Sequence, residues 1–194
     1  MVKNRVLLVL MFILGSIFSC KTWIHTSEGG FWPKKPKFSL ISSGNNNENS
    51  RINTVGIYRL YRTYMGEDNF SSNERMYDKL VSDDEYYKNR PIPILRFYDN
   101  FRYNMFLIKQ ETKISKKLFN PKSGYIGVYS SLNDSIITME SFWYVADSGK
   151  YVKSRGIIKQ DTLHVIEKVY NQISHKIYIK QHVPSDFLDW KADW

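Results

Sequence analysis

The chain has 194 residues, a length that suits one domain plus a tail, and it carries a formal net charge of +9. Its single cysteine, Cys20, excludes an internal disulfide. Aromatic residues are abundant, with 14 Tyr, 11 Phe and 5 Trp. Because Tyr and Phe fit the half-buried face of a pleated sheet, the composition favours β structure.

The first twenty residues have the pattern of an export signal. Lys3 and Arg5 form a basic start, and an apolar run of thirteen residues follows over 6–18. That run fits the apolar region of a secretory signal, about 7–15 residues, and is shorter than the about 20 residues of a spanning helix. An uncleaved anchor and an ordinary secretory signal are the alternatives, but no A-x-A-like cleavage site precedes Cys20.

The residues around Cys20 resemble the lipobox of bacterial lipoproteins. Ile17 lies three positions before the cysteine and the small Ser19 lies just before it. The resemblance implies a signal peptide over 1–19, cleavage before Cys20 and a lipid on its sulfur. That lipid would be the link to a membrane, since two or more acyl chains anchor a protein stably. The thiol would then be unavailable for catalysis or for a metal.

The predicted anchor also bears on location and charge. Lys21 follows Cys20 in place of the aspartate that resembles an inner-membrane retention signal, which favours an outer-membrane lipoprotein facing the periplasm. A secreted or surface-exposed protein is the alternative. Loss of Lys3 and Arg5 lowers the net charge to +7. For an exported protein, a basic balance favours anionic lipid headgroups over nucleic acid as the partner.

Residues 20–50 are predicted to be a lipid-anchored flexible tether. Residues 32–37 combine two prolines with three lysines, and residues 42–50 are a polar, low-complexity stretch. Neither stretch carries enough apolar surface to offset the entropy of ordering. A flexible tether of this length would hold a domain off the membrane and let it reorient.

A β domain is predicted over 51–194. A helical insertion is expected near 66–90, because Ser71 with Glu74 and Ser82 with Glu85 fit capping boxes, and Met76, Leu80 and Val81 have helical spacing behind the first. A tail is expected over 184–194. About eight strands are predicted between residues 51 and 183, near 52–62, 92–98, 101–108, 125–130, 135–145, 151–158, 162–170 and 173–183.

Alternation within these ranges predicts half-buried strands. Ile137, Met139 and Trp143 share one face of their strand, and Glu140 and Phe142 share the other. Strands joined by short turns indicate an antiparallel meander. About eight strands suffice to close a small barrel, which removes exposed edges. The predicted fold is therefore an all-β, lipocalin-like barrel, with a two-sheet β-sandwich as the alternative.

The region 51–183 resembles small lipocalin-like lipoproteins of Gram-negative bacteria. Gly56-Ile57-Tyr58 is similar to the Gly-x-Trp signature that opens the lipocalin barrel, with Tyr in place of Trp. The stretches 95–100 and 156–163 are similar to strand-turn units of that group. The resemblance implies a barrel that binds a small ligand or serves as a structural module, and it identifies no ligand-binding residue.

No constellation of catalytic or metal-binding residues is recognisable. The sequence lacks a His-Glu-x-x-His motif, a Gly-x-Ser-x-Gly elbow and a phosphate-binding glycine loop. We therefore expect no enzyme activity, no metal and no cofactor. The histidines are interpreted as surface or rim residues, and Asp83-Asp84-Glu85 as helix-capping acids. The histidines are His25, His164, His175 and His182.

Two further groups of residues are candidate contacts. The densest basic stretch consists of Lys109, Lys113, Lys116, Lys117 and Lys122, which is read as a solvated loop with anionic lipid or polysaccharide as the alternative partner. Trp190 and Trp194 are expected to dock on the barrel, since exposed tryptophan is costly.

Three functions follow from these expectations. The first is a lipid-anchored binding or structural module that takes an apolar small molecule. The second is an envelope assembly protein that uses the barrel as a scaffold to contact another envelope protein. The third is a hydrolase of envelope material, which would need a cleft with converging titratable groups.

Overall fold

The computed structural model describes residues 23–42, 52–71, 75–81, 85–145, 148–169 and 171–194. The predicted signal 1–19 and Cys20 lie outside these ranges, as do Asp83 and Asp84 and the capping residues Glu74 and Ser82. Within the described ranges, none of the helices has the length and apolarity needed to cross a bilayer.

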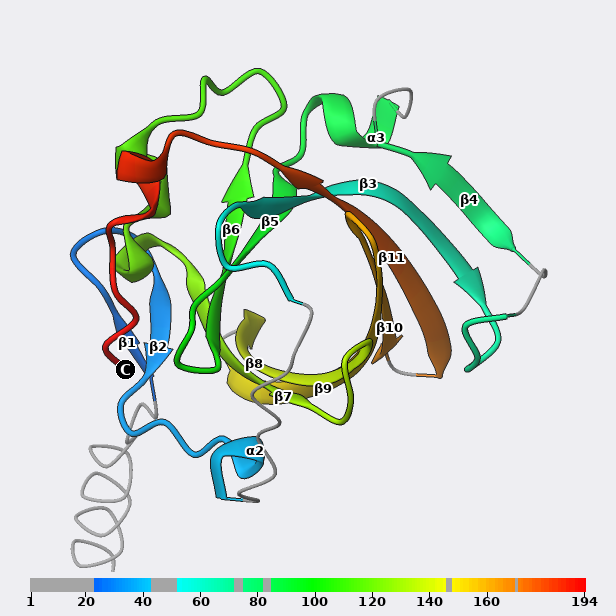
Figure 1. The fold of residues 1–194 in the computed structure, drawn as a ribbon, viewed down its shortest axis with the longest axis horizontal. Helices are drawn as coiled ribbons and strands as arrows, with labels where there is room; N and C mark the ends of the chain where they lie inside the picture. Colours follow the sequence, from blue (N-terminus) through cyan, green and yellow to red (C-terminus); the bar gives the residue numbers. More distant parts are fainter. Residues whose placement is uncertain (1–22, 43–51, 72–74, 82–84, 146–147, 170) are drawn as a thin grey trace, which may run out of the picture.

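Eight of the described strands close an antiparallel barrel, which Figure 1 shows as a ring. Consecutive strands pair from β5 to β11, and β3 pairs with both β5 and β11 and closes the ring. The predicted meander and barrel are confirmed, and the sandwich alternative is wrong. The barrel strands are β3 (Ile57–Gly66), β5 (Ile92–Phe97), β6 (Arg102–Ile108), β7 (Tyr125–Ser131), β8 (Ile136–Val145), β9 (Ser148–Lys159), β10 (Thr162–Val169) and β11 (Gln172–Gln181).

The alternation predicted for β8 sets which side chains fill the barrel. Ile137 and Met139 belong to the main buried cluster, and Trp143 packs against it. Glu140 and Phe142 are also buried, but Phe142 belongs to a separate cluster on the outer face. Burying both faces of β8 requires a second layer outside the barrel wall.

Aromatic rings fill the middle of the barrel among the described residues. Phe97 lies 5.2–5.6 Å, between ring centroids, from Tyr58, Tyr103 and Tyr129. All four side chains are at most 3% exposed. Rings packed at these separations fill the barrel core with side chains. A ligand site is therefore more readily formed at the barrel wall than in the core.

The predicted insertion near 66–90 holds one short strand and one helical turn. Met76 and Leu80 lie in β4 (Met76–Leu80), which pairs with β3 and extends away from the ring in Figure 1. The helix prediction is wrong there because the far half of β3 has no pairing with β5, and β4 satisfies its free backbone groups. A single helical turn, α3 (Glu85–Lys88), follows.

The described part of the predicted tether packs against the barrel. Residues 23–42 form β1 (Trp23–His25), β2 (Phe31–Pro33) and α2 (Ser39–Ser42), over the outer face of β7 and β8. Phe38 is 5% exposed, and Phe31 stacks on Tyr144 at 4.4 Å. The flexible-tether prediction is therefore wrong for residues 23–42. Their aromatic side chains bury enough apolar surface to outweigh the prolines and lysines between them.

The C-terminal tail packs on the outside of the barrel, where Trp194 joins the outer cluster as predicted, whereas Trp190 remains 36% exposed. The indole N–H of Trp190 donates to the Lys116 carbonyl at 3.1 Å, and the Trp194 ring lies 5.6 Å from that of Trp32. Phe119 is buried beneath the basic stretch, in a cluster that Phe187 of the tail joins. The short helices here are η1 (Lys116–Phe119), η2 (Pro121–Ser123) and η3 (Ser185–Leu188).

Candidate functional site

Along its length, strand β3 pairs first with β5 and then with β4, and a pocket lies where the partner changes. Tyr58 and Arg59 are the residues of β3 that pair with β5, and from Arg62 onward β3 pairs with β4. Between them, the Tyr61 carbonyl accepts a hydrogen bond from the N–H of Val81 at 2.9 Å. The start of β5 and the end of β4 therefore approach β3 from different directions and leave a side opening.

A bulge on β3 shapes this side opening. Leu60 lies opposite Tyr178 and Arg62 opposite Ile177, so Tyr61 is an extra residue on β3. A bulge of this kind bends its strand and redirects a side chain, and bulges are common beside functional sites. Tyr61 is 48% exposed at the mouth of the pocket, whereas its neighbour Leu60 is buried.

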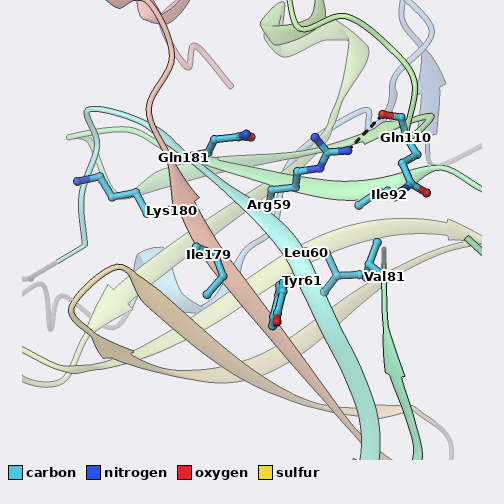
Figure 2. A pocket seen from close by; sticks show the side chains of 9 residues that line it. All are labelled: Arg59, Leu60, Tyr61, Val81, Ile92, Gln110, Ile179, Lys180 and Gln181. Carbon is cyan, nitrogen blue, oxygen red and sulfur yellow. Dashed lines mark hydrogen bonds between the residues drawn. The ribbon is translucent and has the colours of Figure 1, made fainter. Parts of the chain in front are cut away.

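The side opening holds a pocket of about 360 Å³. Figure 2 shows the aliphatic side chains of Leu60 and Val81 together at one end, and Arg59 and Gln110 at the other. The volume and the mostly apolar lining are typical of small-molecule sites, which run from about 300 to 1,000 Å³. The lining consists of Arg59, Leu60, Tyr61, Val81, Ile92, Gln110, Ile179, Lys180 and Gln181.

The polar end of the pocket presents one guanidinium group. Arg59 donates from Nη2 to the Gln110 carbonyl at 3.3 Å, as drawn in Figure 2. Lys180 points away from the other lining residues, and its Nζ lies 3.6 Å from a carboxylate oxygen of Asp161. Arg59 can therefore offer a hydrogen bond to a ligand whose body lies on the apolar floor.

A second group of polar side chains lies on the outer face of β10 and β11. His164 Nε2 is 2.9 Å from His175 Nδ1, and His175 Nε2 is 2.8 Å from the Glu67 carbonyl. A carbonyl only accepts, so His175 Nε2 carries a proton and neutral His175 accepts at Nδ1. His164 then donates from Nε2. The Tyr64 ring stacks on His175 at 4.4 Å.

The surroundings of the histidine pair favour its neutral form. Burial, followed by the charges of His175 and Arg75, lowers the pKa of His164 to about 4. Burial also lowers the pKa of His175, which is completely buried. The pair is suited to hold the β3–β4 connection in place. Among the described residues, no cluster of three or more His, Cys, Asp or Glu is placed to hold a metal ion.

The interpretation of the histidines as surface or rim residues is wrong for His175. No local pattern indicates its pairing with His164, because the two rings meet only through the register of β10 and β11. His25 and His182 are exposed and lie on other parts of the molecule. Glu85 begins α3, and the five lysines of the basic stretch are all exposed.

A charged pair that no sequence pattern indicates lies near the barrel interior. Lys176 Nζ lies 2.5 Å from Glu167 Oε2, and the side chains are only 16% and 8% exposed. The Lys176 ammonium is 5.1 Å from the Trp143 ring centroid. The two groups neutralise one another, so the pair is a structural element.

No family model, curated protein or solved structure matches this chain. The closed eight-stranded antiparallel barrel formed by the described residues is consistent with a lipocalin-like fold.

Proposed function

We propose that the protein is a lipid-anchored cell-envelope lipoprotein whose barrel domain binds a small apolar molecule at the side opening between β3, β4 and β5. The observation that carries the binding proposal is the pocket of about 360 Å³ there, with its apolar floor and the guanidinium of Arg59 at one end. The ligand would carry one hydrogen-bond acceptor facing Arg59. The membrane anchor rests on the lipobox pattern that ends at Cys20.

The position of the pocket favours binding at the wall over binding in the barrel centre. The centre is filled by the rings around Phe97. At the side opening, Ile179 is 37% exposed although it is a large aliphatic residue. A ligand seated there would remove this surface from water, at about 25 cal/mol for each Å² of apolar area.

A pocket-filling variant tests the binding proposal. N-phenyl-1-naphthylamine, an uncharged apolar probe, is titrated into the domain and its fluorescence is followed. We expect saturable binding by the wild type and at least about tenfold weaker binding by Ile179→Trp, because the indole would occupy the pocket. Leu132→Trp is the matched control, since Leu132 is 61% exposed and lies outside the pocket lining.

Two outcomes would overturn the binding proposal. One is the absence of saturable binding by the wild type. The other is equal binding by Ile179→Trp and Leu132→Trp, with both variants folded by circular dichroism, because the probe would then be bound elsewhere.

The anchor is tested separately in cells. Labelled palmitate should be incorporated into the wild type and not into Cys20→Ala, because the sulfur is the expected attachment point. Incorporation that survives Cys20→Ala would refute the anchor and leave the binding proposal intact.

A role as an assembly protein is the second candidate, and the exposed strand β4 favours it. Met76 and Tyr77 are 60% and 73% exposed on this strand. An edge strand with apolar side chains can add a strand from another protein. Site-specific crosslinking from Tyr77 in intact cells is expected to capture an envelope protein, and recovery of the chain alone would count against this role.

A further inference from the structure

A second pocket lies under the C-terminal segment, separate from the side opening. It has a volume of about 500 Å³ and is bounded by the β5–β6 turn, by Thr54 and Val55, and by residues 185–192. Its apolar lining includes Val55, Leu188 and Trp190. Arg96, from the end of β5, also lines it.

Arg96 holds the C-terminal segment over this pocket. Its Nη2 donates to the carbonyls of Leu188 and Trp190, the second at 2.8 Å. The Ala192 carbonyl accepts from Asn100 Nδ2 and from Arg102 Nη1, each at 3.1 Å. The carbonyls of Leu188, Trp190 and Ala192 are thus hydrogen-bonded to the β5–β6 hairpin. The C-terminal segment therefore forms one wall of the pocket.

The charge of Arg96 is compensated only in part by the described residues, because the Asp189 carboxylate favours it from a distance without forming an ion pair with it. Arg96 is only 3% exposed, and none of the ion pairs formed by the described residues includes it. Its Nε and Nη1 are buried and have no hydrogen-bond partner. One face of the guanidinium lies 4.4 Å from the Tyr98 ring centroid, which offsets part of the burial.

The buried guanidinium of Arg96 has N–H donors without partners, which indicates that an acceptor is missing. Buried polar groups in folded proteins nearly always have a partner, and a buried charge is strongly unfavourable without one. Asp189 also lines the pocket, but its carboxylate is 2.7 Å from Lys116 Nζ. An anionic group from outside the chain would supply both the negative charge and the acceptor oxygens.

We propose that the pocket under the C-terminal segment binds a small organic anion, an oxyanion on an apolar body, with Arg96 as the charge partner. The apolar body would lie beside Val55, Leu188 and Trp190. This site does not depend on the side opening, and it would take a charged ligand where the side opening takes an uncharged one.

The test compares an anion with its neutral analogue. Benzoate and benzyl alcohol are titrated into the full chain by isothermal titration calorimetry, and the shift in melting temperature is recorded in parallel. We expect saturable benzoate binding at millimolar concentrations or below, and weaker binding of benzyl alcohol. Arg96→Gln should weaken benzoate binding at least about tenfold, whereas Arg102→Gln, which fastens the same segment but does not line the pocket, should not.

A surface variant keeps the test decisive if Arg96→Gln does not fold. Val55 lines the pocket and is 68% exposed, so Val55→Asp should fold and weaken benzoate binding several-fold by repulsion. Val55→Asn is its neutral control. The proposal is overturned if the wild type does not bind benzoate saturably, if benzyl alcohol binds equally well, or if Val55→Asp binds benzoate as tightly as Val55→Asn.

Discussion

The His164–His175 pair should make the fold sensitive to mild acid. His175 Nε2 is committed to the Glu67 carbonyl, and its Nδ1 accepts from His164. A proton added at His175 Nδ1 would face the N–H of His164, so the contact would break. Arg75 and Lys159 add positive charge near His164 and oppose its protonation further.

The magnitude follows from the pKa of His164, which is lowered from 6.5 to about 4. Between these values the unfolded chain holds a proton that the folded chain does not, so stability falls as the pH drops from about 6.5 toward 4. Above about pH 6.5, the full stabilising contribution of neutral His164 is present. The difference of about 2.5 between the two pKa values corresponds to at most about 3.4 kcal/mol, and solvent at the half-buried ring reduces it.

The assay is urea unfolding of the domain at a series of pH values between 7 and 4. His164→Gln should lose much of the acid dependence, because glutamine can donate to His175 but does not titrate in this range. His182→Gln is the matched control, since His182 is exposed, and it should keep the wild-type dependence. Equal pH profiles for the wild type and His164→Gln would refute the reasoning.

Three further substitutions probe the packing. Gly127→Ala would place a methyl group against the ring of buried Tyr103 and should cost about 1–3 kcal/mol in urea unfolding, and an unchanged midpoint would contradict this contact. Lys176→Met leaves Glu167 buried without its cation and should cost about 3–5 kcal/mol, part of which the added Glu167→Gln should restore; no recovery in that double variant would argue against the pairing. Glu140→Ala removes the acceptor for two donors of α2 and should cost about 1–3 kcal/mol and speed hydrogen exchange there; unchanged exchange would show that the segment is held by other contacts.

The barrel strands were predictable because strand formation depends on local patterns. In β8, Ile137 and Met139 alternate with outward residues, and each of the other seven barrel strands overlaps a predicted range, although β3 continues four residues past its predicted end and β9 begins three residues before its predicted start. A period of two shows which residues share a face, whatever the neighbouring strand is. The number of strands then limits the ways in which the edges can be closed.

The side opening could not be predicted, because it depends on pairing between distant segments. It exists because β3 pairs with β5 at one end and with β4 at the other, whereas the spacing in the sequence predicts a helix in place of β4. The spacing of Met76 and Leu80 suits either structure over so short a stretch. The free edge of β3 decided between them, and that edge is a property of the assembled sheet.

The sequence by itself determined an all-β chain with alternating strands and a lipobox-like start, since both are short-range patterns. Tertiary structure alone decided that residues 23–42 pack on the barrel, that His164 meets His175, and that Arg96 is buried beside a pocket. These outcomes depend on which surfaces meet, and burial changes the free energy of a charge or an aromatic ring only after they have met.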